Sequence, residues 1–264
     1  MTFPQIAAFA RLADGSAEQT RSLAGQTTLL TRAVHYLDYD DVHDEMTIAN
    51  AMAQAILTFR GGANGKEAPI RIIQGPHTQI VSPDFGMSVD PVNNEIYVAE
   101  QDHVKVYPRG ANGDVAPIRI LTGPHTQLKN TQGYEGLRGI GVDWIHDVLV
   151  VTGYYQDKGH ILIFDRTASG DAKPRAVIAG PKSGITGASY TMRVYPPKGW
   201  ILNPISGGIG VWSVNDSGDM PPVYLLGREG AGPMGGRFAI NPKAKEIYSG
   251  SDNLIQAFSF PEIF

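Results

Sequence analysis

The segment YPRGANGDVAPIRILTGPHTQL, residues 107–128, repeats the segment FRGGANGKEAPIRIIQGPHTQI, residues 59–80, at most positions. Weaker copies of the same pattern occupy residues 9–25, 164–180 and 212–227, and a half-copy ends the chain at LIQAFSFPEIF. Self-similarity at a period of about 50 residues is the sequence signature of a repeat architecture, and it decides the fold before any single element is assigned.

One aromatic residue marks each copy, and the markers are Phe9, Phe59, Tyr107, Phe164, Trp212 and Phe258. A glycine stands six residues after each of the first five markers, at Gly15, Gly65, Gly113, Gly170 and Gly218. Asn, Ser or Asp precedes each of these glycines, which is the chemistry of a tight hairpin that needs a residue with positive φ. The chain therefore holds five full periods and the start of a sixth.

Each period predicts four short strands. In the second period, strands are expected at 85–90, 95–100, 104–107 and 118–121, with β-branched and aromatic residues and turn residues between them. First strands of the other periods are expected near 33–39, 138–144, 190–195 and 236–241, and second strands near 46–51, 147–152, 200–204 and 246–250. The Ala- and Met-rich stretch 48–57 aligns with second and third strands, so it too is predicted as strand.

Four-stranded units that repeat every 40–50 residues predict a β-propeller. We expect one all-β domain over 1–264, most simply five-bladed, with repeats at about 6–54, 55–103, 104–159, 160–208 and 209–253 and a closing strand at 254–264. The C-terminal third strand would then pair with an N-terminal fourth strand near 20–24, which leaves the third-strand copy at 6–12 spare. The alternative is a six-bladed ring that another chain or further sequence completes.

Composition excludes several classes of protein. The chain has 264 residues with 22 Lys and Arg against 26 Asp and Glu, a net charge of −4, which argues against nucleic acid or anionic membranes as main partners. No cysteine is present, so a disulfide framework, a thiolate metal site and a thiol nucleophile are excluded. The sequence contains no apolar run of about 18 residues, so no membrane span is predicted. No signal peptide is visible either, and both an exported and a cytoplasmic location stay open.

The pattern APIRIL-GPHTQL, followed by G-x-x-VD, EIYVAE and VKVYPRGANG, resembles the NHL-type propeller repeats of bacteria. The match is strong over 55–128 and looser elsewhere. The wider superfamily that the chain is similar to includes gluconolactonases and other six-bladed hydrolases. This resemblance implies a propeller, but it does not imply one chemistry, because function resides in sites built on the fold.

The ends of the second strands hold a ring of equivalent positions, namely Asn50, Glu100, Thr152, Asn203 and Ser249. Asn50, Glu100 and Asn203 carry hard oxygen donors suited to Ca²⁺. In lactonase-like relatives, a Glu and Asn residues in such a ring hold a divalent metal. The alternative is that these side chains only hold turns by hydrogen bonds, in which case no cofactor is needed.

If the chain is an enzyme, a lactonase-like or ester hydrolase, Glu100 and His103 are its candidate catalytic residues, with His103 as general base. His77 and His125 share one Gly-Pro-His-Thr-Gln context, and such repetition indicates a structural role. The chain has no G-x-S-x-G, H-E-x-x-H, P-loop or dinucleotide motif. The sequence therefore favours a non-enzymatic protein.

The third period alone carries two insertions, at 130–137 and 153–159. They bring Tyr134, Glu135, Tyr154, Tyr155 and Asp157 to the predicted rim, where propeller loops bind ligands. We therefore expect a binding or scaffold module that uses the rim of blades two and three, with a protein, a small molecule or a carbohydrate as its partner. The alternative is a metal-dependent hydrolase at the channel mouth.

Overall fold

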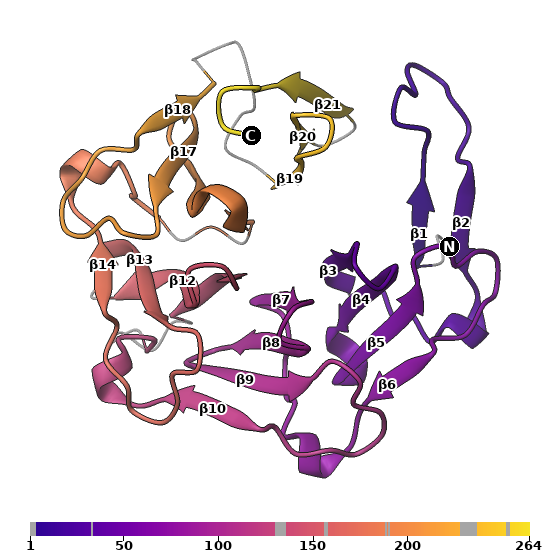
Figure 1. Cartoon of the computed structure of the whole chain (residues 1–264). Helices are drawn as coiled ribbons and strands as arrows, with labels where there is room; N and C mark the ends of the chain where they lie inside the picture. Colours follow the sequence, from indigo (N-terminus) through magenta and orange to yellow (C-terminus); the bar gives the residue numbers. More distant parts are fainter. Residues whose placement is uncertain are drawn as a thin grey trace.

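Each full repeat folds into one antiparallel sheet, and the sheets are arranged as the blades of a propeller around a central channel (Figure 1). The structure is a computed structural model that describes residues 4–32, 34–129, 136–155, 158–187, 189, 191–227, 237–251 and 254–264. The predicted all-β propeller of five blades is confirmed. Within these residues the helical turns are short 3-10 segments, and no helix is long and apolar enough to cross a membrane.

Four blades have four strands each, numbered from the channel outward. Blade 1 contains β3 (Val34–Asp40), β4 (Glu45–Asn50), β5 (Ala55–Arg60) and β6 (Arg71–Ile73). Blade 2 contains β7 (Gly86–Asp90), β8 (Glu95–Glu100), β9 (His103–Pro108) and β10 (Arg119–Thr122). Blade 3 contains β11 (Leu137–Asp143), β12 (Val148–Tyr155), β13 (Lys158–Asp165) and β14 (Ala176–Ile178). Blade 4 contains β15 (Arg193–Tyr195), β16 (Trp200–Ile205), β17 (Gly208–Ser213) and β18 (Tyr224–Leu226).

The fifth blade has three strands, β19 (Arg237–Asn241), β20 (Glu246–Ser251) and β21 (Leu254–Ser259). A separate two-stranded sheet pairs β1 (Gln5–Ala8) with β2 (Arg21–Ala24). In Figure 1 this hairpin lies between blade 5 and blade 1.

The Ala- and Met-rich stretch forms strands, as its alignment predicts. Residues 45–50 and 55–60 are β4 and β5, and the 3-10 turn Ala51–Ala53 joins them. Gln54 follows that turn with a φ of 52°, which reverses the chain. Both strands are buried nearly throughout, so packing between neighbouring blades overrides the helix preference of Ala and Met.

Neighbouring blades are joined through their outer strands. In four of the five fourth strands, β2, β6, β10 and β14, one aliphatic residue forms a parallel bridge to the turn glycine of the following repeat. The bridged pairs are Leu23–Gly65, Ile73–Gly113, Leu121–Gly170 and Ile178–Gly218. The same aliphatic residue packs in one buried cluster with the marker aromatic of that following repeat, for example Ile73 with Tyr107 and Leu121 with Phe164. The turn glycines have φ values from 57° to 86°, a region that side chains disfavour, which explains their regular spacing.

The predicted closure of the ring is wrong. Residues 21–24 pair with β1, whereas β21 pairs only with β20 among the described strands. The physical reason is that β1 lies in the same hairpin and pairs with β2 from Gln5–Ala24 to Ala8–Arg21, so it occupies the edge of β2 that β21 would need. Leu23 of β2 still bridges Gly65 of blade 1. The β1–β2 hairpin thus supplies the third and fourth strands that precede blade 1, and the third-strand copy that was left spare is β1.

Candidate functional site

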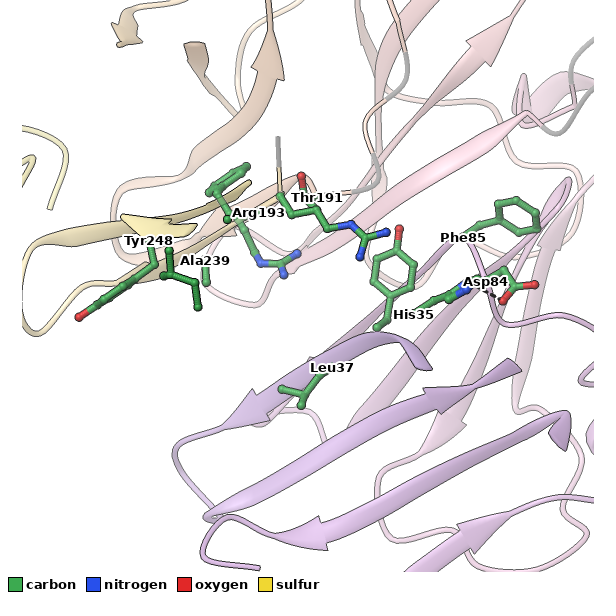
Figure 2. A pocket seen from close by; sticks show the side chains of 13 residues that line it. His35, Leu37, Asp84, Phe85, Thr191, Arg193, Ala239 and Tyr248 are labelled. Atoms are coloured by element: carbon green, nitrogen blue, oxygen red, sulfur yellow. Dashed lines mark ion pairs between the residues drawn. The ribbon is translucent and has the colours of Figure 1, made fainter. Parts of the chain in front are cut away.

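A cavity of about 700 Å³ lies in the central channel. Its walls come mainly from the first strands β3, β15 and β19, together with the segment that precedes β7, and Tyr248 and Ile255 of blade 5 close one side. Figure 2 shows Thr191 and Arg193 on one side of the cavity and His35, Leu37 and Asp84 on another. A volume of this size holds a small molecule or one or two side chains of a partner.

The charges that line the cavity are mixed, with an excess of cations. His35 and Asp84 form a pair, with Nδ1 and Oδ1 2.8 Å apart. Arg193 donates to the carbonyl of Met192 at 3.0 Å, and within the described part of the chain neither Arg193 nor Arg237 forms an ion pair. Arginines of the outer strands, in contrast, are held by carboxylates, as Arg71, Arg119 and Arg166 show. Two guanidinium groups are therefore left to face the cavity.

Asp38 follows Leu37 of the cavity lining on β3, and it is half-buried. Its carboxylate accepts the backbone N–H of Val89 at 2.7 Å. Burial raises the pKa of Asp38, while the bond from Val89 and the charge of Arg193 act in the opposite direction. Asp38 therefore compensates the charge of Arg193 only in part.

The ring at the ends of the second strands is buried, and most of its polar atoms are used inside the fold. Asn50 Oδ1 accepts the backbone N–H of Thr31 at 3.0 Å and its hydroxyl at 2.5 Å, and Asn50 Nδ2 donates to the carbonyl of Leu29 at 2.9 Å. Glu100 accepts the N–H groups of Val81 and Ser82 in the equivalent loop. These side chains hold the connection that leads into the first strand of their own blade. Asn203 Oδ1 is the exception, because it is buried without a hydrogen-bond partner in the described structure.

Glu100 is also the centre of a charged cluster. Lys105 Nζ donates to its Oε2 at 2.6 Å, and His103 Nε2 lies 3.3 Å from the same oxygen. Burial acts to raise the pKa of Glu100, but the bonds from His103 and Lys105 outweigh burial and lower it. The hydrogen bond to Glu100 raises the pKa of His103, which favours the imidazolium form and opposes action as a base at neutral pH. A cation at Asn50, Glu100 and Asn203 would have to compete with Lys105, and the metal site stays a prediction.

The insertions of blade 3 fall largely outside the described residues. Tyr134, Glu135 and Asp157 lie there, and of Tyr155 only the backbone in β12 is described. Tyr154 is half-buried, and its N–H donates to the carbonyl of Gly136 at 2.7 Å. The predicted ligand-binding role of these five residues stays a prediction.

His77 and His125 lie outside the cavity, in two equivalent clamps between blades. His77 Nδ1 contacts Asp114 Oδ2 at 2.6 Å, and His125 Nδ1 contacts Asp171 Oδ2 at 2.5 Å. Each acid follows the turn glycine of the next blade, so the Gly-Pro-His-Thr-Gln motif fixes neighbouring blades to each other.

Sequence reasoning missed the residues that line the cavity, Arg193 and Ala239 among them. One equivalent position of the first strands, seven residues before the start of each second strand, is occupied by Asp38, Ser88, Gly141, Arg193 and Ala239. Their side chains differ in charge and size, although the outer strands repeat closely. That loss of repetition on strands that line the channel is the signal that could have identified the site.

Comparison with known proteins supports the fold alone. No protein-family model matches the chain, and no curated protein matches it by sequence. Among solved structures, the chain is similar to the crystal structure of the Cps50 (Swd1) β-propeller domain of Myceliophteria thermophila, with a TM-score of 0.56, 11% identity and coverage of 88% of this chain and 67% of that one. The chain is thus a β-propeller, as the repeats predict, and a binding or scaffold role is compatible with that fold.

Proposed function

We propose that this propeller is a non-catalytic binding module whose central cavity holds a carboxylate- or phosphate-bearing group. The observation that carries the proposal is the pair Arg193 and Arg237, which line the cavity without an ion pair in the described structure. Guanidinium groups recognise carboxylates and phosphates by charge and by paired N–H donors. The group that enters belongs either to a small molecule or to a side chain of a partner protein.

The rim of blades two and three supports a wider contact around the same ligand. Leu137, the last residue of the insertion at 130–137, begins β11. The guanidinium of the adjacent Arg138 stacks over Phe85, which lines the cavity, at 5.4 Å from the ring centre. In this proposal the loops with Tyr134, Glu135, Tyr154, Tyr155 and Asp157 contact the part of the ligand that projects from the cavity. We also propose that the repeats are of the NHL type, on the basis of the sequence pattern that resembles such repeats.

The test is calorimetric titration and thermal melting with two probes, citrate and inorganic phosphate, against glycerol as a neutral control. We expect at least one anion to bind and to raise Tm, by an amount equivalent to about 2.7 kcal/mol at 100 times Kd. Arg193→Gln and Arg237→Gln should each weaken the response, whereas the matched variant Arg60→Gln should keep it, because Arg60 pairs with Glu67 on the surface. An equal response in all four proteins, or none to either anion, would overturn the proposal.

A further inference from the structure

A second site lies in the gap between blade 5 and the β1–β2 hairpin (Figure 1), and we call this gap the seam. It adjoins the cavity, because Tyr248 and Ile255 belong to both. Beyond the proposed cavity function, we propose that the seam binds an extended segment of a partner polypeptide that carries the pattern Arg-x-Leu or Arg-x-Ile and pairs with the free edge of β21. The chain's own repeats define this chemistry, because three kinds of contact that fourth strands make elsewhere have counterparts at the seam.

The first counterpart is the carboxylate of Glu246, which pairs with one arginine, whereas the equivalent carboxylates in blades 1 and 2 each pair with two. Glu95, at the start of a second strand, accepts Arg119 of its own fourth strand and Arg166 of the next blade, and Tyr97 donates to it as well. Glu45 likewise contacts Arg71 of its own fourth strand and Arg109 of the next blade.

Glu246 has the same kinds of partner as Glu95, except for the arginine of a fourth strand. Tyr248 donates to its Oε2 at 2.6 Å, and Arg11 Nη1 lies 2.7 Å from its Oε1. Arg11 follows the marker Phe9 by two residues, as Arg109 follows Tyr107 and Arg166 follows Phe164. The hairpin therefore stands where the next blade belongs, and no fourth-strand arginine reaches Glu246 among the residues described.

The second counterpart is a pair of exposed apolar side chains. Ile255 precedes its marker aromatic by three residues and is 71% exposed, although the equivalent residues Ile56, Val104, Ile161 and Ile209 are at most 1% exposed. Each of those four lies directly opposite an aliphatic residue of its fourth strand, and these residues are Ile73, Leu121, Ile178 and Leu226. Ile255 has no such cross-strand partner in the described sheet.

Phe9, on the other side of the seam, is also less buried than its equivalents in the other repeats. It is 50% exposed, whereas the markers Phe59, Tyr107, Phe164 and Trp212 are completely buried. Those four aromatics share their buried clusters with the fourth-strand aliphatic of the preceding repeat. An aliphatic residue paired opposite Ile255 would therefore also cover Phe9.

The third counterpart is the turn glycine of the hairpin. Gly65, Gly113, Gly170 and Gly218 each bridge a fourth-strand aliphatic of the preceding repeat, and within the described chain Gly15 bridges none. Gly15 has the same left-handed conformation, with a φ of 57°. One extended strand would thus pair with β21, place its arginine at Glu246, cover Ile255 and Phe9 and bridge Gly15. This is strand addition to a sheet edge, in which backbone bonds give affinity and alternate side chains give specificity.

Among the described residues, every fourth strand is already used by its own and its neighbouring sheet. Leu23, Ile73, Leu121 and Ile178 are all engaged with the following blade, and Leu226 is buried in the cluster that includes Phe238 and Ile247 of blade 5. The edge of β2 that could pair with β21 is occupied by β1. The occupant is therefore assigned to a partner polypeptide.

The test uses a fluorescein-labelled peptide that copies Ala116–Gly123, APIRILTG, titrated into the 1–264 chain by fluorescence anisotropy. We expect saturable binding, a loss of about tenfold or more in affinity for Glu246→Gln, and no change for the matched control Glu67→Gln. A peptide with Gln in place of its arginine should bind as weakly to the wild-type chain as the original peptide binds to Glu246→Gln. The backbone amides of β21 should exchange quickly in the free protein and slowly with the peptide bound.

Four results would overturn the proposal. The peptide fails to bind, or it binds equally well to Glu246→Gln. The amides of β21 are already protected in the free monomer, which would mean that the chain closes its own seam. Sedimentation shows a dimer that the peptide does not dissociate, which would mean that a second copy fills the seam.

Discussion

Arg166 of blade 3 donates from Nη1 to Oε2 of Glu95 in blade 2 at 2.8 Å, and so joins two neighbouring blades through their outer halves. Arg119 donates to both oxygens of the same carboxylate at 2.8 and 2.7 Å. Burial acts to raise the pKa of Glu95, but these bonds outweigh it and lower the pKa. Glu95 therefore stays ionised, and it compensates two arginines that are themselves only slightly exposed.

Glu95→Gln should lower the free energy of unfolding by about 2 kcal/mol, because two guanidinium groups lose their counter-charge in a largely buried site. Glu246→Gln should cost less, since Glu246 pairs with one arginine that is half exposed. Urea unfolding of both variants measures the difference. Equal losses would show that the second arginine adds nothing to the contact between blades.

Phe59→Ala should lower the free energy of unfolding by about 3–5 kcal/mol, because it leaves a cavity between β2 and blade 1. Phe9→Ala removes the same side chain from an equivalent position, yet it should change stability by no more than about 0.5 kcal/mol, because Phe9 is exposed. Thermal or urea unfolding of the two variants compares them directly. A large loss for Phe9→Ala would mean that the hairpin packs against blade 5 in solution.

His160 should make the protein less stable in mild acid. Burial lowers its pKa to about 4, so the unfolded chain binds the proton more tightly than the native chain does. The stability from this residue is complete above pH 6.5 and falls by about 1.4 kcal/mol per pH unit between pH 6.5 and pH 4. His160→Gln should have a shallower pH dependence over that window, measured by urea unfolding at pH 5, 6 and 7. Parallel profiles for both proteins would contradict this prediction.

A Ca²⁺ site at Asn50, Glu100 and Asn203 predicts a rise in Tm with Ca²⁺ that a chelator reverses, worth about 2.7 kcal/mol at 100 times Kd. Since Lys105 competes for Glu100, Lys105→Met should respond to lower Ca²⁺ concentrations than the wild type. The control is Glu67→Gln, whose carboxylate lies on the surface beside Arg60. Melting curves that are identical with Ca²⁺ and with chelator, in wild type and Lys105→Met alike, would exclude the site.

The sequence by itself determined the elements and their order. The spacing of Phe59, Tyr107 and Phe164 and of their turn glycines predicts the blades, because each marker must be buried by the neighbouring repeat and each turn needs a positive φ. It also predicts strand for residues 48–57 against helix propensity, since alignment with the other repeats carries information about packing that local preference lacks. The fold class, most strand positions and the repetitive role of His77 and His125 were accessible in this way.

Only the tertiary structure decided what the ends of the chain do and which side chains meet in the channel. Strand pairing at the closure depends on whether β2 pairs with β1 or with β21, and no local pattern compares these two energies. The cavity brings together His35, Asp84, Arg193 and Arg237 from four different blades, more than 150 residues apart at the extremes, and repeat matching discards them because they break the pattern. Repetition encodes the contacts that every blade needs, whereas a site used once is formed by the ring as a whole.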